Sequence, residues 1–297
     1  MSKLFYPAIL IILLAAVSYA QSIDSSRTDY YSPPNIYRFA EYLYSNGDYP
    51  AAAGEYLRYL LYLDDTDSKR AKILYQIGQC YRKNSDYEKA AKYYDQVIES
   101  NHSNIYADSA KFQNAVSLYS ANRFIDAIRY NETQEESLSI DNIKFRMMIL
   151  SGVNYLNLGY KQDAAMVADF SPISTSNDSL TSWYGKAVNR AMSLPHRSPL
   201  AAGVMSSIIP GSGKIYCGRP YDGIYSLLVI SMMAWQAYDG FDADGSSTAK
   251  GWIYGSIGSV FYLGNIYGSV VGAKIYNHQH EKDFLRQINI EFRYYLD

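Results

Sequence analysis

The sequence has few of the residues on which metal-binding and disulfide-rich proteins depend. Its 297 residues include only two cysteines, Cys80 and Cys217, and four histidines. Two cysteines cannot build a disulfide framework, and four histidines are too few for most zinc architectures. An excess of positive charge is also missing, because 27 Lys and Arg stand against 29 Asp and Glu. The chain therefore lacks the basic field that DNA or RNA binding requires.

Motifs for catalysis are missing as well. The run Gly211–Lys214 resembles the end of a phosphate-binding loop, but Ile208 stands where that motif needs its first glycine and Ile215 where it needs Ser or Thr. His278 and His280 could reach a metal ion, although histidines at this spacing in a polar segment are more often solvated. Serine-hydrolase and zinc-protease motifs do not occur. The sequence therefore predicts no enzyme, no metal and no cofactor.

The first 20 residues have the layout of a secretory signal. Lys3 precedes an apolar run over residues 10–17, and the small residues Ser18 and Ala20 precede Gln21. We expect cleavage after residue 20 and a linker over residues 21–32. An uncleaved membrane anchor is the alternative, and either form would export the rest of the chain.

A repeat of 37 to 38 residues lies between residues 33 and 170. Four small residues recur at this step, and a second series lies twelve residues behind the first. The first series is Ala40, Gly78, Ala115 and Gly152, and the second is Ala52, Ala90, Ala127 and Ala164. Two series in phase predict pairs of helices that approach each other closely at small side chains. Turn residues such as Asn46–Asp48 and Asn84–Asp86 separate the expected helices and supply Gly or Asn for a left-handed cap.

These residues resemble the tetratricopeptide repeat family, whose pattern is Gly or Ala, Tyr, Gly-x-Tyr, Ala, and Tyr or Phe. The second copy matches with Gly78, Tyr81, Tyr87, Ala90 and Tyr94. The last two copies depart from the pattern, with Asn131 and Ala168 in place of the second helix's aromatic residue and Lys161 in place of the tyrosine after the turn. The resemblance implies an all-α solenoid of about four helix pairs over residues 33–194, with a capping helix near residues 180–193.

Such solenoids bind protein segments along the surface formed by the first helix of each pair. Carried onto this chain, the family's inward positions form a predicted groove for an envelope protein or peptide. They are Tyr37, Glu41, Tyr44, Tyr75, Arg82, Phe112, Tyr119 and Arg146. Tyrosine and arginine are enriched at binding hot spots. The alternative is that the tyrosines fill the packing between repeats.

The composition changes after a linker at residues 195–199. Residues 200–277 are predicted to form a hydrophobic membrane module, because uncharged stretches cover residues 199–213, 223–238 and 251–273. The basic residues beside these stretches favour three crossings, with the repeats periplasmic and the protein in a bacterial inner membrane. Two crossings are a further alternative, as is a soluble helical domain with buried apolar helices.

Two short motifs belong to this part of the chain. Gly264, Gly268 and Gly272 form two overlapping G-x-x-x-G steps, which predict close helix packing or self-association. Residues 210–218 resemble the P-G-x-G-x-x-Y-x-G signature of small bacterial membrane modules, which implies a membrane hairpin. The tail at residues 278–297 fits both a helix and a strand, and an amphipathic helix at the membrane surface is preferred.

Together these patterns predict an envelope protein in which an exported repeat domain recruits a partner and a C-terminal module holds it at the membrane. The alternative is a component of envelope protein assembly or translocation whose membrane module contacts the client.

Overall fold

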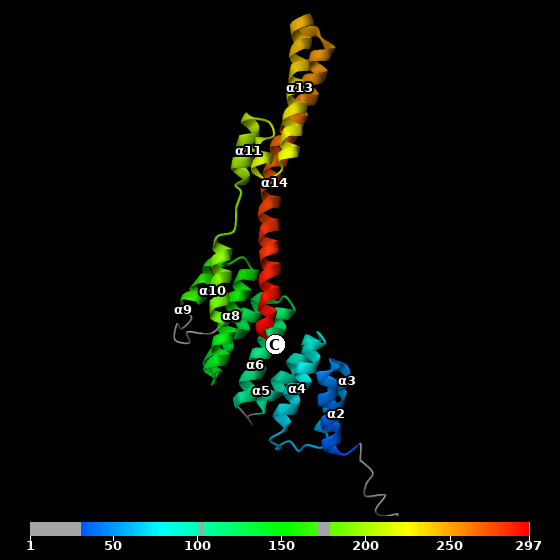
Figure 1. Ribbon diagram of the computed structural model, residues 1–297, viewed down its shortest axis with the longest axis vertical. Helices are drawn as coiled ribbons and strands as arrows, with labels where there is room; N and C mark the ends of the chain where they lie inside the picture. Colours follow the sequence, from blue (N-terminus) through cyan, green and yellow to red (C-terminus); the bar gives the residue numbers. More distant parts are fainter. Residues whose placement is uncertain (1–30, 101–103, 171–178, 297) are drawn as a thin grey trace, which may run out of the picture. The chain divides into compact units, whose positions relative to one another are not determined.

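The computed structural model describes residues 31–100, 104–170 and 179–296, and all regular structure in these ranges is helical. The predicted signal at residues 1–20 lies outside the described residues. Contacts divide the chain into an N-terminal unit, residues 1–151, and a C-terminal unit, residues 152–297. The division falls inside α8, and the predicted domain boundary at residues 195–199 stays a prediction. The helices, shown in Figure 1, are α2 (Pro33–Ser45), α3 (Tyr49–Leu60), α4 (Arg70–Lys83), α5 (Tyr87–Glu99), α6 (Asn104–Ser120), α7 (Phe124–Gln134), η1 (Glu135–Ser137), α8 (Asp141–Asn157), α9 (Lys161–Phe170), α10 (Ser179–Met192), α11 (Pro199–Ile208), α12 (Ser212–Tyr216), α13 (Pro220–Asp244), η2 (Gly245–Ser247) and α14 (Ala249–Leu296).

The helix pairs predicted from the repeat are confirmed as α2–α3, α4–α5, α6–α7 and α8–α9. Each pair turns through one residue with a left-handed backbone, which is Gly47, Ser85, Asn122 or Gly159 in order along the chain. These residues succeed one another at the repeat's own steps of 38, 37 and 37. Asp48 and Asp86 then begin α3 and α5, since each carboxylate accepts a hydrogen bond from the backbone N–H three residues on, at 3.3 Å.

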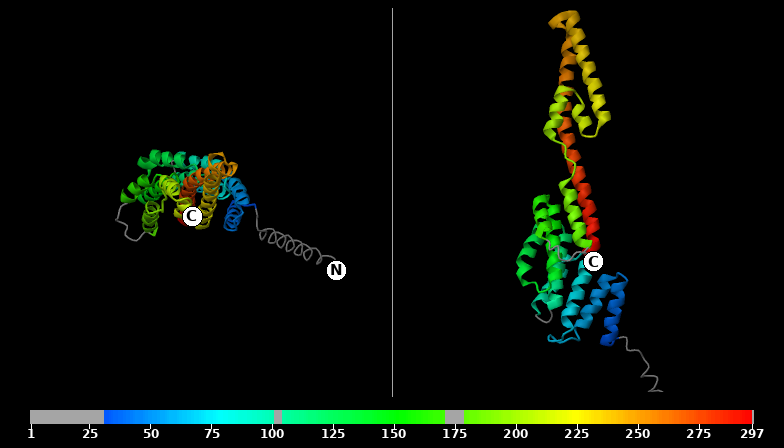
Figure 2. Two further views of the ribbon diagram at one scale, coloured as in Figure 1. Left: turned by 90° about the horizontal axis from the view of Figure 1, so that it is seen from above. Right: turned by 60° about the vertical axis from the view of Figure 1, so that its left-hand side comes forward.

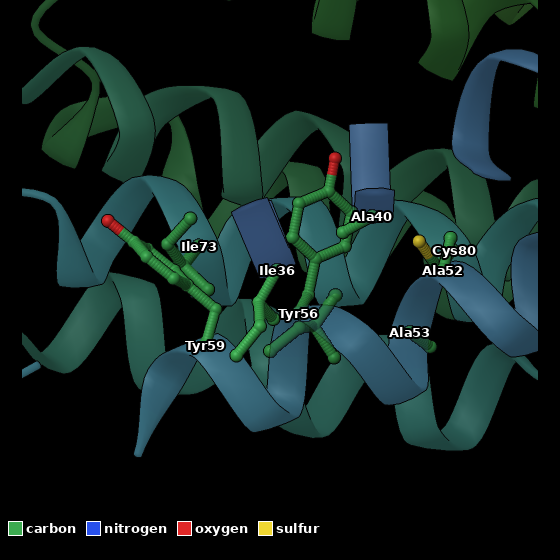
Figure 3. Packing of buried hydrophobic residues seen from close by; sticks show 9 residues of the cluster. Ile36, Ala40, Ala52, Ala53, Tyr56, Tyr59, Ile73 and Cys80 are labelled. Atoms are coloured by element: carbon green, nitrogen blue, oxygen red, sulfur yellow. The ribbon is translucent and has the colours of Figure 1, made fainter. Parts of the chain in front are cut away.

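Small residues let the two helices of a pair approach closely. The side chains of Ala40, Ala52 and Ala90 are fully buried. At Gly78 a Cβ atom would stand 2.5 Å from the Tyr94 ring, so a larger residue there would require the ring to shift. Around these contacts an ordinary apolar core forms from large side chains, and Figure 3 shows Ile36, Tyr56 and Ile73 gathered between the helices. Burial of such side chains stabilises a fold by about 1.5–3 kcal/mol each.

The departures from the repeat pattern have structural replacements. Asn131, which stands at the position of Tyr56 and Tyr94, is buried and donates hydrogen bonds to the Met147 carbonyl at 3.0 Å and the Ser151 hydroxyl at 2.8 Å. It therefore ties α7 to α8 through polar contacts where an aromatic ring would pack. In the C-terminal unit, Ala168 leaves space beside α8 that Tyr184 of α10 takes. The Tyr184 ring lies against Gly152, and its hydroxyl donates to the Ala164 carbonyl at 2.7 Å.

The end of α14 packs on α10 inside the C-terminal unit. Phe284, Ile288 and Phe292 recur every four residues and are buried. The Phe292 ring stacks on Trp183 with centroids 5.4 Å apart, and the Trp183 indole donates to Glu291 at 2.7 Å. In Figure 2 the last part of α14 runs beside α10. The tail is helical, as preferred from the sequence, but α10 covers its apolar face, so that face is not left for a membrane surface.

Glycines shape the connection from α11 to α13. Gly211 has a left-handed backbone with φ of 88°, and a Cβ there would collide with the Gly223 carbonyl. Gly213 lies equally close to the Ala202 carbonyl. The glycines of the P-G-x-G-x-x-Y-x-G signature therefore let α12 fold tightly between α11 and α13. Helix α13 extends from Pro220 to Asp244, and α14 then runs back beside it, so that the two helices form a hairpin (Figure 1).

The length and apolarity of these helices correct the prediction of three membrane crossings. In the described part of the chain, no helix is both long and apolar enough to cross a membrane. The stretch at residues 199–213 is broken because α11 ends at Ile208 after 10 residues. The stretches at residues 223–238 and 251–273 stay helical, but Gly, Ser and Tyr alternate with their aliphatic residues and lower the mean hydropathy.

Candidate functional site

The predicted groove residues lie on α2, α4, α6 and α8, and all of them belong to the N-terminal unit. Their exposure divides them into two groups. Phe112 and Tyr119 are only 4% and 5% exposed, so they pack inside the unit. The other six are partly exposed and can meet a ligand. They are Tyr37, Glu41, Tyr44, Tyr75, Arg82 and Arg146.

At the α2 end of this surface, polar groups hold one another in place. The Tyr56 hydroxyl donates to the Glu41 carboxylate at 2.5 Å, and the Lys72 ammonium donates to the Tyr37 hydroxyl at 2.9 Å. Burial, followed by the hydrogen bond to Glu41, raises the pKa of Tyr56 above its ordinary value. Tyr44 meets the edge of the Tyr49 ring at 5.5 Å, and burial raises the pKa of Tyr44 to about 12. Both tyrosines therefore stay neutral donors at physiological pH.

A second group joins α4, α6 and α8, and we call it the Tyr75 cluster: Tyr75, Gln79, Arg82, Gln113 and Arg146. The Gln79 amide donates to the Tyr75 hydroxyl at 2.7 Å, and Arg82 donates to the Gln79 carbonyl oxygen at 3.1 Å. Burial raises the pKa of Tyr75, and the hydrogen bonds of Gln79 and Gln113 and the charges of Arg82 and Arg146 oppose that rise. Arg146 also lies over the Phe112 ring, 4.5 Å from its centroid.

The Tyr75 cluster combines two guanidinium groups with three neutral side chains, so its charge is positive. Gln113 adds a buried amide whose Oε1 makes no hydrogen bond within the described residues. The charged donors and the tyrosine ring on the partly exposed side of this cluster can bind an acidic side chain of a peptide. Sequence reasoning missed Gln79 and Gln113. Gln79 could have been found, because it stands four residues after Tyr75 on the same helix face.

The three glycines predicted for helix packing have different surroundings in the C-terminal unit. A Cβ at Gly264 would meet nothing within 4 Å, one at Gly268 would meet the Lys214 side chain, and one at Gly272 would meet Cys217 and Arg219. A close approach of α13 to α14 lies elsewhere, because a Cβ at Gly240 would stand 2.7 Å from the backbone nitrogen of Gly251. Gly264 therefore marks an open position on α14.

Comparison with protein families gives one match, to the tetratricopeptide repeat over residues 71–104. This segment begins inside α4 and includes all of α5, so it coincides with the second helix pair and with Tyr75 and Arg82 of the cluster. The predicted repeat is confirmed there. Neither the search of curated proteins nor the search of solved structures found a match. A tetratricopeptide repeat suggests a scaffold for protein–protein interaction.

Proposed function

We propose that this protein is a non-catalytic scaffold that binds an extended segment of another protein across α2, α4, α6 and α8. The Tyr75 cluster carries the proposal, because it gathers two arginines and a buried amide from three helices onto one partly exposed surface. The segment that fits it carries an acidic side chain toward Arg82 and Arg146. A charge-assisted hydrogen bond of this kind contributes about 1.5–3 kcal/mol.

Charge reversal tests this function. A photo-crosslinking amino acid in place of Tyr44 captures the partner in the cells that make the protein, and Arg82→Glu or Arg146→Glu lowers capture at least tenfold. Arg129→Glu is the matched control, because Arg129 lies on α7, its side chain is 71% exposed and it pairs with Asp126 of its own helix. Circular dichroism checks that each variant keeps its helices. Equal capture by all variants would show that the cluster binds no partner.

The alternative, in which the module of α11–α14 contacts a client during envelope protein assembly or translocation, uses a different surface. A crosslinker in place of Gly264 tests it, because this position is open in the structure. Capture of one protein from position 44 supports the scaffold. Capture of many different exported chains from position 264 supports the alternative.

We further propose that the scaffold works in the cell envelope, exported by residues 1–20 and held at a membrane through residues 199–277. The layout of residues 1–20 and the uncharged stretches support this location. The test is fractionation of cells that make the full chain, followed by protease treatment of intact spheroplasts. Recovery in the membrane fraction, with the repeats digested from outside, is expected. Recovery in the cytosol would refute the location.

A further inference from the structure

The module formed by α11, α12, α13 and the first part of α14 has an unusual distribution of side chains. Between residues 200 and 275, the buried positions hold almost only Gly, Ala, Ser, Thr, Cys and Asn, and Ile230 is the single large aliphatic residue among them. The large apolar side chains point outward instead. Of 34 exposed large hydrophobic residues in the described part of the chain, 23 belong to this stretch. The helix pairs of the N-terminal unit, with Ile36, Tyr56 and Ile77 inside, show the ordinary arrangement.

Polar side chains complete the interior of this module. The hydroxyls of Ser206 on α11 and Ser269 on α14 are hydrogen-bonded at 2.7 Å, and Ser206 also accepts from the Gly213 backbone N–H at 3.0 Å. Asn265, one turn before Ser269, is 3% exposed, and its side-chain amide makes no hydrogen bond within the described residues. Small and polar residues between helices, with large apolar residues outside, are the pattern of helices packed in lipid, where close packing and hydrogen bonds hold helices together. The mean hydropathy of a whole helix does not show this pattern, because it averages the outward and the inward face.

The outer surface is too wide for one partner helix. At 100° per residue, the exposed apolar residues from Tyr221 to Phe241 cover an arc of about 200° on α13, and those from Trp252 to Ile275 cover about 180° on α14. A helix that packs on one neighbour needs an apolar stripe of only about 100°. A surrounding apolar solvent covers both arcs at once.

Few charged side chains lie along this surface. Residues 223–238 of α13 and 251–273 of α14 are free of charge, which at 1.5 Å per residue gives uncharged stretches about 24 Å and 34 Å long. Arg219 lies beside Gly272, close in sequence to Lys274, and pairs with Asp222 at 2.6 Å, while the Lys214 ammonium donates to the Ser226 hydroxyl at 2.7 Å. Asp239, Asp242 and Asp244 lie at the C-terminal end of α13.

We infer that lipid acyl chains cover the outer surface of the α11–α14 module, with anionic headgroups beside Lys214, Arg219 and Lys274. This inference rests on the proposed membrane location and adds the surface and the class of partner. It is a statement about which side chains contact lipid.

Tryptophan fluorescence separates this surface from the rest of the chain, because two of the three tryptophans lie on it. Trp235 and Trp252 are 72% and 61% exposed, whereas Trp183 is stacked on Phe292. The full chain is reconstituted into vesicles of phosphatidylcholine with phosphatidylglycerol, with or without bromine on the acyl chains. Variants in which two tryptophans are replaced by phenylalanine each leave one reporter. Brominated lipid is expected to quench Trp235 and Trp252 at least twofold and to leave Trp183 unchanged; equal emission from all three would overturn the inference.

Vesicle flotation adds a matched pair of variants. Replacement of Leu228, Val260 and Leu263 by Glu is expected to lower flotation at least tenfold, while helicity stays unchanged because these side chains are 64%, 70% and 64% exposed. The control places Glu at Leu61, Tyr62 and Ile125, which are equally exposed in the repeats, and keeps flotation. Wild-type flotation is expected to be stronger with phosphatidylglycerol than with phosphatidylcholine alone, and an equal response would overturn the headgroup assignment. If the wild-type chain forms a defined oligomer in water and does not float with vesicles, a second copy covers this surface and the inference is overturned.

A failure here is distinguishable from a failure of the proposed location. If the protein is recovered in the membrane fraction but brominated lipid does not quench Trp235 and Trp252, the proposed location stands and the proposed lipid contact is refuted.

Discussion

The closest contact of the tetratricopeptide pair, between Gly78 and Tyr94, gives the sharpest test of how the repeat is built. In Gly78→Ala the new methyl group would stand 2.5 Å and 2.7 Å from two carbons of the Tyr94 ring, and 3.0 Å from a third. The ring cannot swing away freely, because Tyr94 is fully buried and its centroid lies 5.9 Å from that of Tyr75. Overpacking of this kind costs about 1–3 kcal/mol. Alanine recovers about 1 kcal/mol of helix propensity, so the net loss is about 0–2 kcal/mol.

Gly54→Ala on α3 is the matched control. A Cβ there would meet nothing within 4 Å, so only the propensity gain of about 1 kcal/mol remains. The two variants should therefore differ by about 1–3 kcal/mol in the free energy of opening. Hydrogen exchange measures each effect locally, on the α4 and α5 amides for Gly78→Ala and on the α2 and α3 amides for Gly54→Ala, and it avoids treating a chain of two units as one transition. A double variant Gly78→Ala with Tyr94→Leu should recover part of the loss. If Gly78→Ala stabilised α4 and α5 as much as Gly54→Ala stabilises α2 and α3, the reasoning would be refuted.

Three further predictions concern single groups. Burial raises the pKa of Cys80 to about 12, so at pH 8 a thiol reagent should modify Cys80 at least about a hundredfold more slowly in the native protein than in denaturant; similar rates would contradict its burial. Tyr184→Phe removes the hydrogen bond to the Ala164 carbonyl and should cost about 0.5–1.5 kcal/mol, measured by urea unfolding against Tyr160→Phe, whose ring is exposed. The hydrogen bond from Trp183, followed by those from Gln287 and Arg190 and the Arg190 charge, lowers the pKa of Glu291 below 4.5. Its stabilising contribution is therefore present above pH 4.5 and is lost as the pH falls through the lower folded value, and Trp183 fluorescence should follow that loss, which Glu291→Gln should abolish.

The repeat could be predicted from the sequence because its constraints act on single positions. A close helix pair needs a small residue at each contact, and a tight turn needs a residue that tolerates a positive φ, so Gly78, Gly47 and Asn122 are visible without a structure. The replacement of a missing aromatic residue could not be predicted. Tyr184, which packs beside Gly152, comes from α10, a helix outside the repeat of 37 to 38 residues. The alanine at position 168 does not indicate which side chain packs there in place of the missing aromatic residue.

The candidate site was predicted in outline only. The sequence position of a residue on the first helix of a pair predicts which face of the helix its side chain lies on, but it does not predict how deeply that side chain is buried. Phe112 and Tyr119 point the same way along α6 as the other predicted residues do on their helices, yet they are buried, because α6 is covered along most of its length, as the burial of Lys111 and Asn114 shows. Depth depends on neighbouring helices, and a single sequence does not specify how closely these approach.

The helix α14 carries both parts of the C-terminal unit in one element of 48 residues. Most of its exposed large apolar residues lie at or before Ile275, whereas Phe284, Ile288 and Phe292 are buried and Ile290 and Tyr294 stay exposed. The two parts of the helix therefore differ in what covers their apolar side chains: α10 packs on the second part, whereas the exposed side chains of the first part are not covered within the described residues. The change lies beside Asn277, whose amide accepts from the Arg197 backbone N–H at 2.7 Å and donates to the Arg197 carbonyl at 2.9 Å. The Arg197 guanidinium lies over the Tyr216 and Tyr276 rings at 4.7 Å and 5.4 Å. Paired amide contacts and a stacked cation therefore fix the linker to α14 at the point where the burial of its apolar side chains changes.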